Sequence, residues 1–444
     1  MNKIGVTYTS MIPLPSLRWQ KKRMWLISLF PLLFVSDVLY GAIDYFGIEM
    51  PITPGVIFRG MVLIFSIYFV FTRLHIVNKK LFLFISLAVI SVLPSTMICL
   101  YYGSSFFYDL SFLTKVLYLP LVTGMIVVLR ERYKISSDEI LKYVEYSSYV
   151  LGGALLISQL FGIQRETYGD YAFGNTGIFY AQNDMTLAFG LALLASGYRL
   201  VFTRFSWLRL SLLIMSAYAC VQIGTRASLA VLLGMGCTVV ACVIWCDSEG
   251  RKSAFGKMKK FITGASVVFV MSTIFLYGLA QQQEYGFQQQ KLDEVVQGEF
   301  PRLLLFLAGT EHISARSVWF DLFGEGADGF HRGVAKYFSK SESRRMVEVD
   351  LIDIFGGYGI SFSMLIHLFV FSILLVTARQ FFLNRDGTYC LIAAATLLYL
   401  AHSLLAGHAL TSPIPTTLMA GYFSIFFGRD YSLSLGHVHS RVAG

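Results

Sequence analysis

Four basic side chains lie at the edges of long apolar runs, where their positions indicate a functional site. Arg226 stands in the stretch VQIGTRASLA (221–230), a turn of a few residues between two apolar runs. Arg59, Lys115 and Arg302 lie at comparable edges. Cations at membrane depth are usually functional and face the bundle interior or a wet cavity, whereas the simpler interpretation is that they extend to lipid headgroups. A guanidinium stays charged, and its planar fork matches phosphate oxygens.

A group of polar residues opens the apolar run near residue 180. The stretch FGNTGIFYAQNDMTLAFG (173–190) contains Asn175, Gln182, Asn183 and Asp184. A helix that begins here has free backbone N–H groups in its first turn, which attract anions. One Asn or Asp could simply cap the helix. Three polar residues in a row favour a polar pocket instead.

Acidic residues gather where the chain enters a later apolar run. The stretch VEVDLIDIFGGYG (347–359) carries Glu348, Asp350 and Asp353, and the two aspartates share one face of a helix. A solvated acidic helix start is the simpler interpretation. Three carboxylates at a membrane entry are a costly way to achieve it, which favours a function.

The polar segment before these acids has the pattern of an amphipathic helix followed by a glycine turn. It reads RLLLFLAGTEHISARSVWFDLFGEGADGF (302–330), and the predicted helix carries Arg302, His312 and Arg316. In Gly324-Glu325-Gly326, backbone N–H groups could approach an anion, although an ordinary loop is the commoner meaning of this pattern.

The sequence shows no motif for a metal or cofactor. His402 and His408 lack the spacing and carboxylate context of a metal site, and lone histidines are usually structural. There is no Walker A sequence, no HExxH and no CxxC pair among the six cysteines. We therefore expect no metal, cofactor or disulfide framework.

Membrane-spanning helices must position these residues. Of the 444 residues, 55% are hydrophobic and 14% charged, against about 25% charged in soluble proteins. Apolar runs long enough to cross a bilayer predict an all-α polytopic transmembrane helical bundle of about 12 spans. The predicted spans are 24–46, 55–73, 80–101, 111–129, 145–163, 177–197, 207–223, 228–245, 260–280, 359–378, 388–408 and 411–428.

The basic residues predict the orientation. The net charge of +9 could suggest nucleic acid in a soluble protein, but most Lys and Arg fall in alternate short loops, as the positive-inside rule requires. We expect no nucleic-acid partner, two cytoplasmic termini and a long, partly helical periplasmic loop before the tenth span. The predicted parts are 1–280 (spans one to nine), 281–351 (the loop) and 352–444 (spans ten to twelve and a cytoplasmic tail). Asp37, inside the first run, has no predicted partner.

Three motifs follow one another in a characteristic order. They are an outer-turn G-T-R-A-S, an Arg-led loop helix ending in W-x-x-L-F-G-x-G, and E-x-D-x-x-D-x-x-x-x-Y-G. This order resembles the O-antigen polymerase and O-antigen ligase superfamily of bacterial polytopic membrane glycosyltransferases. The resemblance covers roughly the last two thirds of the chain. Arg226 matches the outer-turn arginine, and Arg302 the arginine that opens the loop helix.

The resemblance implies an enzyme of the inner membrane with a periplasmic active site. Such enzymes pass a glycan from a polyprenyl (undecaprenyl) diphosphate to an acceptor hydroxyl. The acceptor is another lipid-linked repeat unit in polymerases and lipid A–core in ligases. Ligases usually carry His-Asn where this chain reads Glu348-Val349-Asp350, which favours a polymerase. The implied partners are the lipid-linked oligosaccharide, the bilayer, and a flippase and chain-length regulator of the same pathway.

The implied chemistry assigns roles to the residues. Negative charge grows on the leaving diphosphate as the anomeric bond breaks, and fixed cations can stabilise it without a metal. Arg226 and Arg302 are predicted as the principal diphosphate clamp, with Arg59 and Lys115 as helpers. Glu348 is the first choice of general base and Asp350 the second. The predicted substrate-binding residues are Asn183, Asp184, Arg316, His331, His402 and His408.

Two other functions remain open on this evidence. One is a ligase that uses lipid A–core, and the other is a flippase or transporter without bond chemistry. Transporters usually place charges near the bilayer midplane, in repeated halves. In this sequence the notable charges gather at one boundary and no repeat is evident, which favours an enzyme.

Overall fold

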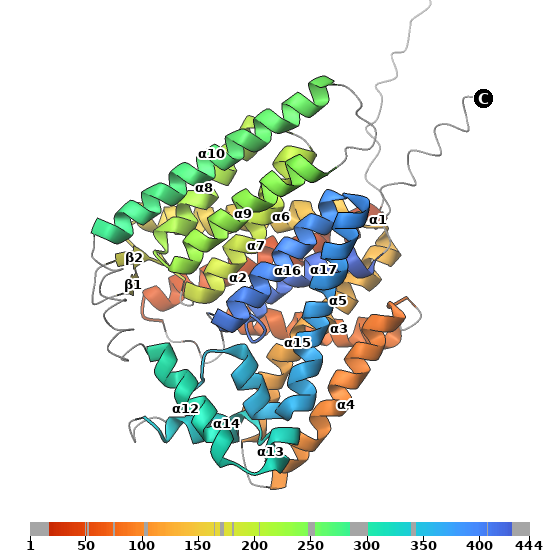
Figure 1. Cartoon of the computed structure of the whole chain (residues 1–444), viewed down its shortest axis with the longest axis vertical. Coiled ribbons are helices and arrows are strands. Elements are labelled where there is room, and N and C mark those ends of the chain that lie inside the picture. Colours follow the sequence, from red (N-terminus) through yellow and green to blue (C-terminus); the bar gives the residue numbers. More distant parts are fainter. Residues whose placement is uncertain are drawn as a thin grey trace, which may run out of the picture.

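The computed structural model describes residues 17–48, 50, 53–73, 76–101, 105–163, 165–168, 173–179, 182–203, 205–246, 254–284, 301–338, 343–405 and 407–428. These residues form helices almost throughout, which confirms the predicted all-α polytopic bundle (Figure 1). A short antiparallel pair joins β1 (Glu166–Tyr168) to β2 (Phe173–Asn175). The terminal residues 1–16 and 429–444, to which the predicted cytoplasmic termini refer, lie outside the described residues.

The helices fall on either side of residues 285–300. Those before it are α1 (Leu17–Leu29), α2 (Pro31–Tyr45), α3 (Pro54–Thr72), α4 (Lys79–Tyr101), α5 (Phe106–Tyr133), α6 (Ser137–Leu160), α7 (Gln182–Phe202), α8 (Trp207–Gln222), α9 (Arg226–Trp245) and α10 (Ala254–Glu284). Those after it are α12 (Pro301–Ala315), α13 (Val318–Phe323), α14 (Ala327–Ala335), α15 (Asp350–Asn384), α16 (Gly387–Leu405) and α17 (Pro413–Phe427).

Every predicted span overlaps a helix, but not every helix is long and apolar enough to cross a membrane alone. In the described part of the chain, 8 helices meet that condition, or 9 if α1 and α2 form one span bent by 42°. The bend falls where Pro31 starts α2, since proline cannot continue the hydrogen-bond pattern of a helix. The remaining predicted spans are α6, α8 and α17. Together these helices make the chain a multi-pass membrane protein.

Helix α17 can be short because it lies at the centre of the bundle. Its 15 residues extend about 22 Å, and it packs between α5, α6 and α7. Tyr422 of α17 is fully buried and its hydroxyl donates to the Leu191 carbonyl of α7 at 2.6 Å. A helix that is enclosed by other helices does not contact lipid, so its length need not match the thickness of the bilayer.

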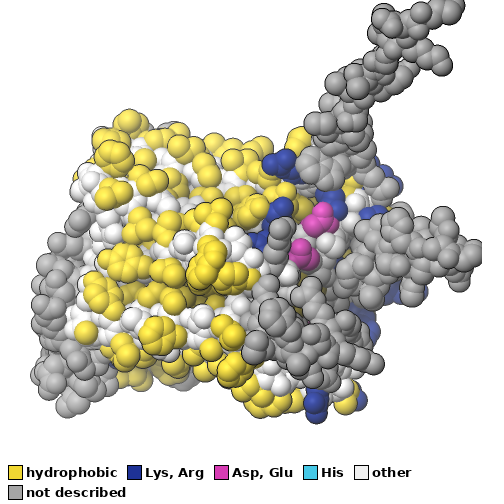
Figure 2. Space-filling view, turned by 90° about the horizontal axis from the view of Figure 1, so that it is seen from above, with side chains coloured by type: hydrophobic (Ala, Val, Ile, Leu, Met, Phe, Trp, Pro, Cys, Tyr) yellow, Lys and Arg dark blue, Asp and Glu magenta, His cyan; other side chains and the backbone are white. Residues whose placement is uncertain are grey.

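The outer helices present apolar side chains to the surroundings. Ile64 and Phe65 of α3 and Leu83 of α4 are all exposed. Figure 2 shows hydrophobic side chains across the viewed face and Lys and Arg gathered toward one end. This distribution is what a bilayer requires of a spanning bundle.

The predicted periplasmic loop is partly helical, as expected. Helices α12, α13 and α14 lie together against the first part of α15 (Figure 1). Helix α15 is two helices joined at Gly359, whose φ of 75° and ψ of 176° are not helical. A Cβ there would lie 2.4 Å from the Leu322 carbonyl oxygen, so only glycine fits. The tenth span was predicted to begin at this residue, and the preceding helix, 350–358, belongs to the layer of α12–α14.

Asp328 ties this helical layer to the bundle. Its buried carboxylate accepts a hydrogen bond from the Ser105 N–H before α5 at 2.8 Å and contacts Arg332 at 2.9 Å and Arg344. Burial works to raise the pKa of Asp328, but the Ser105 and Arg344 hydrogen bonds and the charge of Arg332 outweigh it and hold this pKa below its ordinary value.

We expect Asp328→Asn to lower the free energy of unfolding at pH 7 by about 1–3 kcal/mol, because charged hydrogen bonds are lost. A lowered pKa in the folded state stabilises the protein above the ordinary value of about 4, and this contribution disappears as the pH falls through the folded pKa. The difference in the free energy of unfolding between wild type and variant should therefore become smaller below about pH 4. Thermal unfolding in detergent and hydrogen exchange of α14 measure it. Glu311→Gln, an exposed carboxylate of α12, is the control; an equal loss in that variant contradicts the prediction.

Candidate functional site

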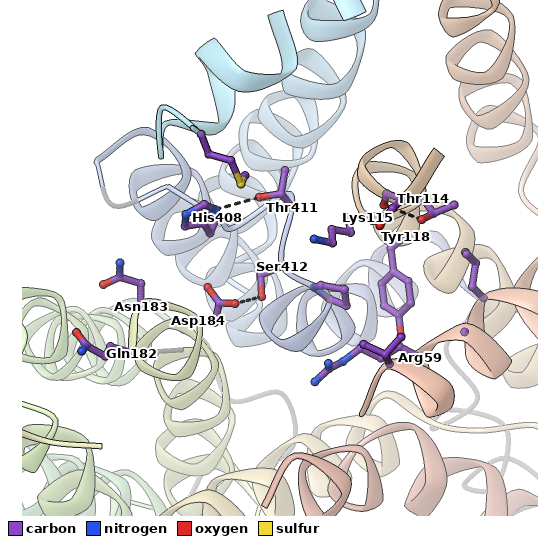
Figure 3. Close-up of a pocket in the computed structure, with 16 residues that line it drawn as sticks. Arg59, Thr114, Lys115, Tyr118, Gln182, Asn183, Asp184, His408, Thr411 and Ser412 are labelled. Atoms are coloured by element: carbon purple, nitrogen blue, oxygen red, sulfur yellow. Dashed lines mark hydrogen bonds between the residues drawn. The ribbon is translucent and has the colours of Figure 1, made fainter. Parts of the chain in front are cut away.

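A cavity of about 860 Å³ lies where α3, α5, α7 and the connection between α16 and α17 meet (Figure 3). Five of the predicted site residues line it: Arg59, Lys115, Asn183, Asp184 and His408. The other lining residues are Val56, Gly60, Leu63, Ser111, Thr114, Tyr118, Gln182, Met346, Thr411, Ser412 and Pro413.

The two cations of the cavity come from different helices. Arg59 of α3 and Lys115 of α5 both border the cavity, and Figure 3 shows them on the same side of it, opposite Gln182 and Asn183. Arg59 forms an ion pair with Asp37 of α2, and both side chains are largely buried. This pair accounts for Asp37, for which the sequence indicated no partner. It also fixes α2 against α3 beside the cavity.

Three helices begin at the cavity wall. Val56 in the first turn of α3, Gln182 to Asp184 in α7 and Pro413 in α17 all line it. The first turn of a helix carries N–H groups without partners in the helix and the positive end of the helix dipole. These ends, with Arg59 and Lys115, add positive potential to a cavity that the Asp184 carboxylate also lines.

Asp184 faces the cavity from the polar cluster that the sequence singled out. Its Oδ2 accepts a hydrogen bond from the Ser412 hydroxyl at 2.6 Å, which joins α7 to the start of α17 (Figure 3). Asn183 lies beside it on the lining. The polar pocket predicted for the start of this helix is therefore present in the structure.

Asp350 lies behind the cavity wall and is buried. One oxygen accepts the Leu410 N–H at 2.8 Å and the other accepts the Thr411 hydroxyl at 3.0 Å. Tyr399 donates to the neighbouring Ala409 carbonyl at 2.8 Å. These contacts hold the connection from which His408, Thr411 and Ser412 line the cavity.

Glu348, the predicted base, is not among the residues that line the cavity; its backbone packs against the connection at Gly407. Its φ of 65° and that of His408, 61°, are left-handed, which is uncommon for residues other than glycine. Between them Gly407, with φ of 67°, packs so closely that a Cβ would lie 1.8 Å from the Glu348 carbonyl oxygen. Strained backbone of this kind clusters at functional sites.

Arg302 contacts Glu348, and neither Arg302 nor His402 lines the cavity. The Arg302 Nε lies 3.7 Å from the Glu348 carboxylate, and its Nη1 donates to the Leu405 carbonyl at 3.4 Å. His402 is buried at the end of α16, and its Nε2 has no hydrogen-bond partner among the described residues.

Arg226 lies at the same end of the bundle but does not line the cavity. It is the exposed first residue of α9, and Thr225 before it caps that helix by accepting the Ser228 N–H at 3.1 Å. The Thr225 hydroxyl also lies 3.2 Å from that of Thr186, in the first turns of α7. Arg226 is thereby placed beside the helix end that carries Asn183 and Asp184.

Arg316 and His331, two predicted substrate-binding residues, make internal contacts in the layer of α12–α14. Arg316 contacts Asp321 at 3.0 Å and Glu325 at 3.1 Å and donates to the Gly356 carbonyl at 2.8 Å. The fully buried His331 bridges Tyr108 at 2.9 Å and Asp353 at 3.0 Å.

The glycine turn next to them also bonds internally. Gly326 donates its N–H to the Gly357 carbonyl at 2.9 Å, and the Asp328 N–H donates to Asp109 at 2.9 Å. The acidic group that approaches this turn is therefore the carboxylate of Asp109, a residue of α5.

Sequence reasoning overlooked several residues of the site. Asp37 was noticed without a role, and Thr411, Ser412 and Tyr118 were not singled out. A signal existed for the pair Thr411-Ser412, because polar residues before Pro413 are typical of a helix start. Nothing in the spacing links Tyr118 to the cavity. In the described ranges, no group of three His, Cys, Asp or Glu side chains could hold a metal ion.

We expect Gly407→Ala to displace Glu348 from His408, because the new methyl group would overlap the Glu348 carbonyl. The left-handed conformation alone costs about 1–2 kcal/mol. Gly47→Ala is the matched control: Gly47 has φ of 73° with nothing within 4 Å of a Cβ. Thermal unfolding should show a larger loss for Gly407→Ala than for Gly47→Ala. Equal losses would mean that the close packing at Gly407 is unimportant.

The model of the family described as O-antigen ligase like membrane protein matches residues 19–293. No curated protein matches the chain. The matched region includes the arginine turn and the helices that supply Arg59, Lys115, Asn183 and Asp184, whereas the Arg302 helix and the acidic motif lie beyond it. Because the match covers more than half of the chain, the protein belongs to this family, which supports a polysaccharide-related membrane enzyme.

Proposed function

We propose that this member of the O-antigen ligase-like family is a polysaccharide polymerase. It transfers a glycan from a polyprenyl (undecaprenyl) diphosphate to the nonreducing-end hydroxyl of another lipid-linked repeat unit, without a metal. One observation carries the proposal: Arg59 and Lys115 share a cavity with the N-terminal ends of α3, α7 and α17, within a membrane bundle of this family.

The cavity suits the diphosphate of such a carrier. Two phosphate groups can contact Arg59, Lys115 and the N–H groups of the three helix starts. Val56 of α3 lines the cavity and is exposed, and Ile64 farther along the same helix is exposed as well. The polyprenyl chain can therefore stay in lipid along α3 while its diphosphate enters the cavity.

The cations act when the glycosidic bond to the carrier breaks. The bonding electrons pass to the phosphate oxygen, and the new charge is stabilised by fixed donors that need no reorganisation. A single donor of this kind contributes about 3–4 kcal/mol. Arg226, beside the start of α7, and Arg302, beside Glu348, complete the positive surroundings and remain part of the proposed clamp.

Glu348 is the proposed general base. It takes the proton from the acceptor hydroxyl while that oxygen forms the new bond to the anomeric carbon. The Arg302 Nε lies 3.7 Å from its carboxylate. Asp350 uses both oxygens to hold residues 410 and 411, so we assign it a positioning role. Asn183, Asp184 and His408 contact the sugars, and we assign no direct contact to the buried His402.

The orientation of the molecule supports a periplasmic site. The cavity lies at the start of α3 and α5, whereas Arg73 and Arg132 lie at the opposite ends of these helices. Basic residues mark the cytoplasmic side of an inner-membrane protein. The acidic Glu348-Val349-Asp350, in place of the His-Asn of ligases, supports a polymerase.

Neutralising the cations of the proposed clamp tests the mechanism. We expect Lys115→Gln, Arg226→Ala and Arg302→Ala each to reduce chain extension, by about 100- to 1000-fold where the cation contacts the leaving phosphate, without changing protein abundance. Glycan length on gels and turnover of lipid-linked repeat units measure this. Arg165→Gln is the control, because Arg165 pairs with Asp44 outside the cavity. Wild-type glycan length in the three variants contradicts the clamp.

Arg59 needs a double variant, because its loss alone leaves Asp37 buried without a partner. Arg59→Gln with Asp37→Asn removes both charges, so we expect it to fold and to remain inactive. Recovery of wild-type turnover in the double variant would show that Arg59 serves only as the partner of Asp37.

Purified protein with lipid-linked repeat units alone distinguishes the candidate functions. We expect longer lipid-linked products, separated by mass spectrometry. Products that form only after lipid A–core is added would establish a ligase instead. Movement of the lipid across vesicles with no new glycosidic bond would establish a flippase.

A further inference from the structure

A second cavity, of about 820 Å³, lies at the other end of the bundle and has no part in the proposed reaction. It is formed by the end of α3, the start of α4, the end of α5 and the end of α17. Four cations and one carboxylate line it, together with a mostly apolar wall. The lining residues are Arg73, Ile76, Val77, Asn78, Lys79, Lys80, Val127, Val128, Glu131, Arg132, Phe427 and Gly428.

The cations of this cavity give it a strong positive charge. Arg73, Lys79, Lys80 and Arg132 stand against Glu131, a formal excess of three positive charges. Within the described residues, no carboxylate forms an ion pair with Arg73, Lys79 or Lys80. A topology signal requires basic residues near the end of a span, but it does not require them to converge on a hollow between helices.

The structure also supplies an ordered polar edge. The Asn78 side chain accepts the Lys80 N–H at 3.0 Å and lies 3.5 Å from the Phe427 carbonyl of α17. These contacts fix the start of α4 against the end of α17, so the two lysines project from a held turn. The N–H groups at the start of α4 add to the positive potential there.

The apolar wall indicates that the ligand is an amphiphile. Ile76 and Phe427 line the cavity and are partly exposed, and Phe427 stacks on Phe369 at 5.9 Å. The neighbouring faces of α3 and α4 are exposed and apolar, as at Tyr68 and Leu83. A soluble anion would leave this wall wet, whereas a lipid can place its phosphate on the cations and its glycerol and upper acyl chains on the wall.

We propose that this cavity binds the headgroup of an anionic phospholipid, with its phosphate held by Arg73, Lys79 and Lys80. The inference is independent of the proposed glycosyl transfer. Basic pockets between transmembrane helices at the cytoplasmic surface recognise lipid phosphates in this way, and each nearby cation contributes enough to change the affinity about fivefold. A bound lipid would join α3, α4, α5 and α17 at their ends.

Native mass spectrometry of the full chain in detergent tests the proposal, with phosphatidylglycerol and phosphatidylcholine of the same acyl chains as probes. We expect wild type to retain phosphatidylglycerol in preference to phosphatidylcholine. Lys79→Gln should weaken phosphatidylglycerol binding about fivefold, and the triple variant Arg73→Gln/Lys79→Gln/Lys80→Gln should remove the preference. The charge-conserving triple Arg73→Lys/Lys79→Arg/Lys80→Arg should keep it.

The matched control is Arg379→Gln, which removes an exposed cation of α15 that does not line the cavity. An equal loss in this control would show that only overall charge matters and would overturn the site. Retention of the preference by the neutral triple variant, or equal binding of both lipids by wild type, would overturn it as well. Displacement of phosphatidylglycerol by an equal concentration of inorganic phosphate would show a site for free anions and reject the lipid.

Discussion

The structure depends on the free-energy cost of placing ionised groups inside a membrane bundle. An isolated charge in a low-dielectric interior is strongly unfavourable, so each buried cation must meet a carboxylate, a carbonyl or an aqueous cavity. Arg59 meets Asp37 and the cavity. Arg199 meets Asp138 at 2.9 Å and also Glu145. Each such pair joins two helices, and the pairs therefore help to determine which helices are neighbours.

The same requirement explains why α6 is not apolar enough to count as a membrane span by itself. Helix α6 carries Asp138 and Glu145, and both side chains contact Arg199 of α7. At the same end, the fully buried Arg130 of α5 donates to backbone and hydroxyl oxygens of residues 135, 137 and 424. Helices α6 and α17 therefore make polar contacts inside the bundle in place of contacts with lipid. For this reason α6 does not need the hydropathy of an outer span, and α17 does not need its length.

Contacts with the layer of α12–α14 hold Glu348 beside the connection between α16 and α17. Asp353 accepts the N–H groups of Val347 at 2.9 Å and Glu348 at 3.1 Å, and His331 buttresses it from α14. These bonds hold Glu348 in its left-handed conformation beside Gly407. The internal contacts of His331 and Asp353 therefore support the proposed base indirectly, while the cations of α3 and α5 lie on the other side of the connection from α16 to α17.

Several features followed from the sequence alone. Apolar runs fix where helices form, because their length must match the bilayer. A charged or polar residue at the edge of such a run is a candidate for a function, and Arg59, Lys115, Asn183, Asp184 and His408 were predicted as site residues in this way. The acidic motif likewise marked Glu348 as a candidate.

Tertiary structure decided which of these residues share a cavity. Asp184 and Ser412 are separated by 228 positions and yet hydrogen-bonded, and no periodicity predicts such a pair. Tertiary structure also places Arg59 in the lining of the cavity and Arg226 beside the cavity. It gives internal partners to three further predicted residues, Asp350, Arg316 and His331. The physical reason is that a charge in an apolar run is costly to bury wherever the chain folds, so the sequence alone reveals this cost. The group that offsets the cost comes from a distant part of the chain and is brought close only by helix packing.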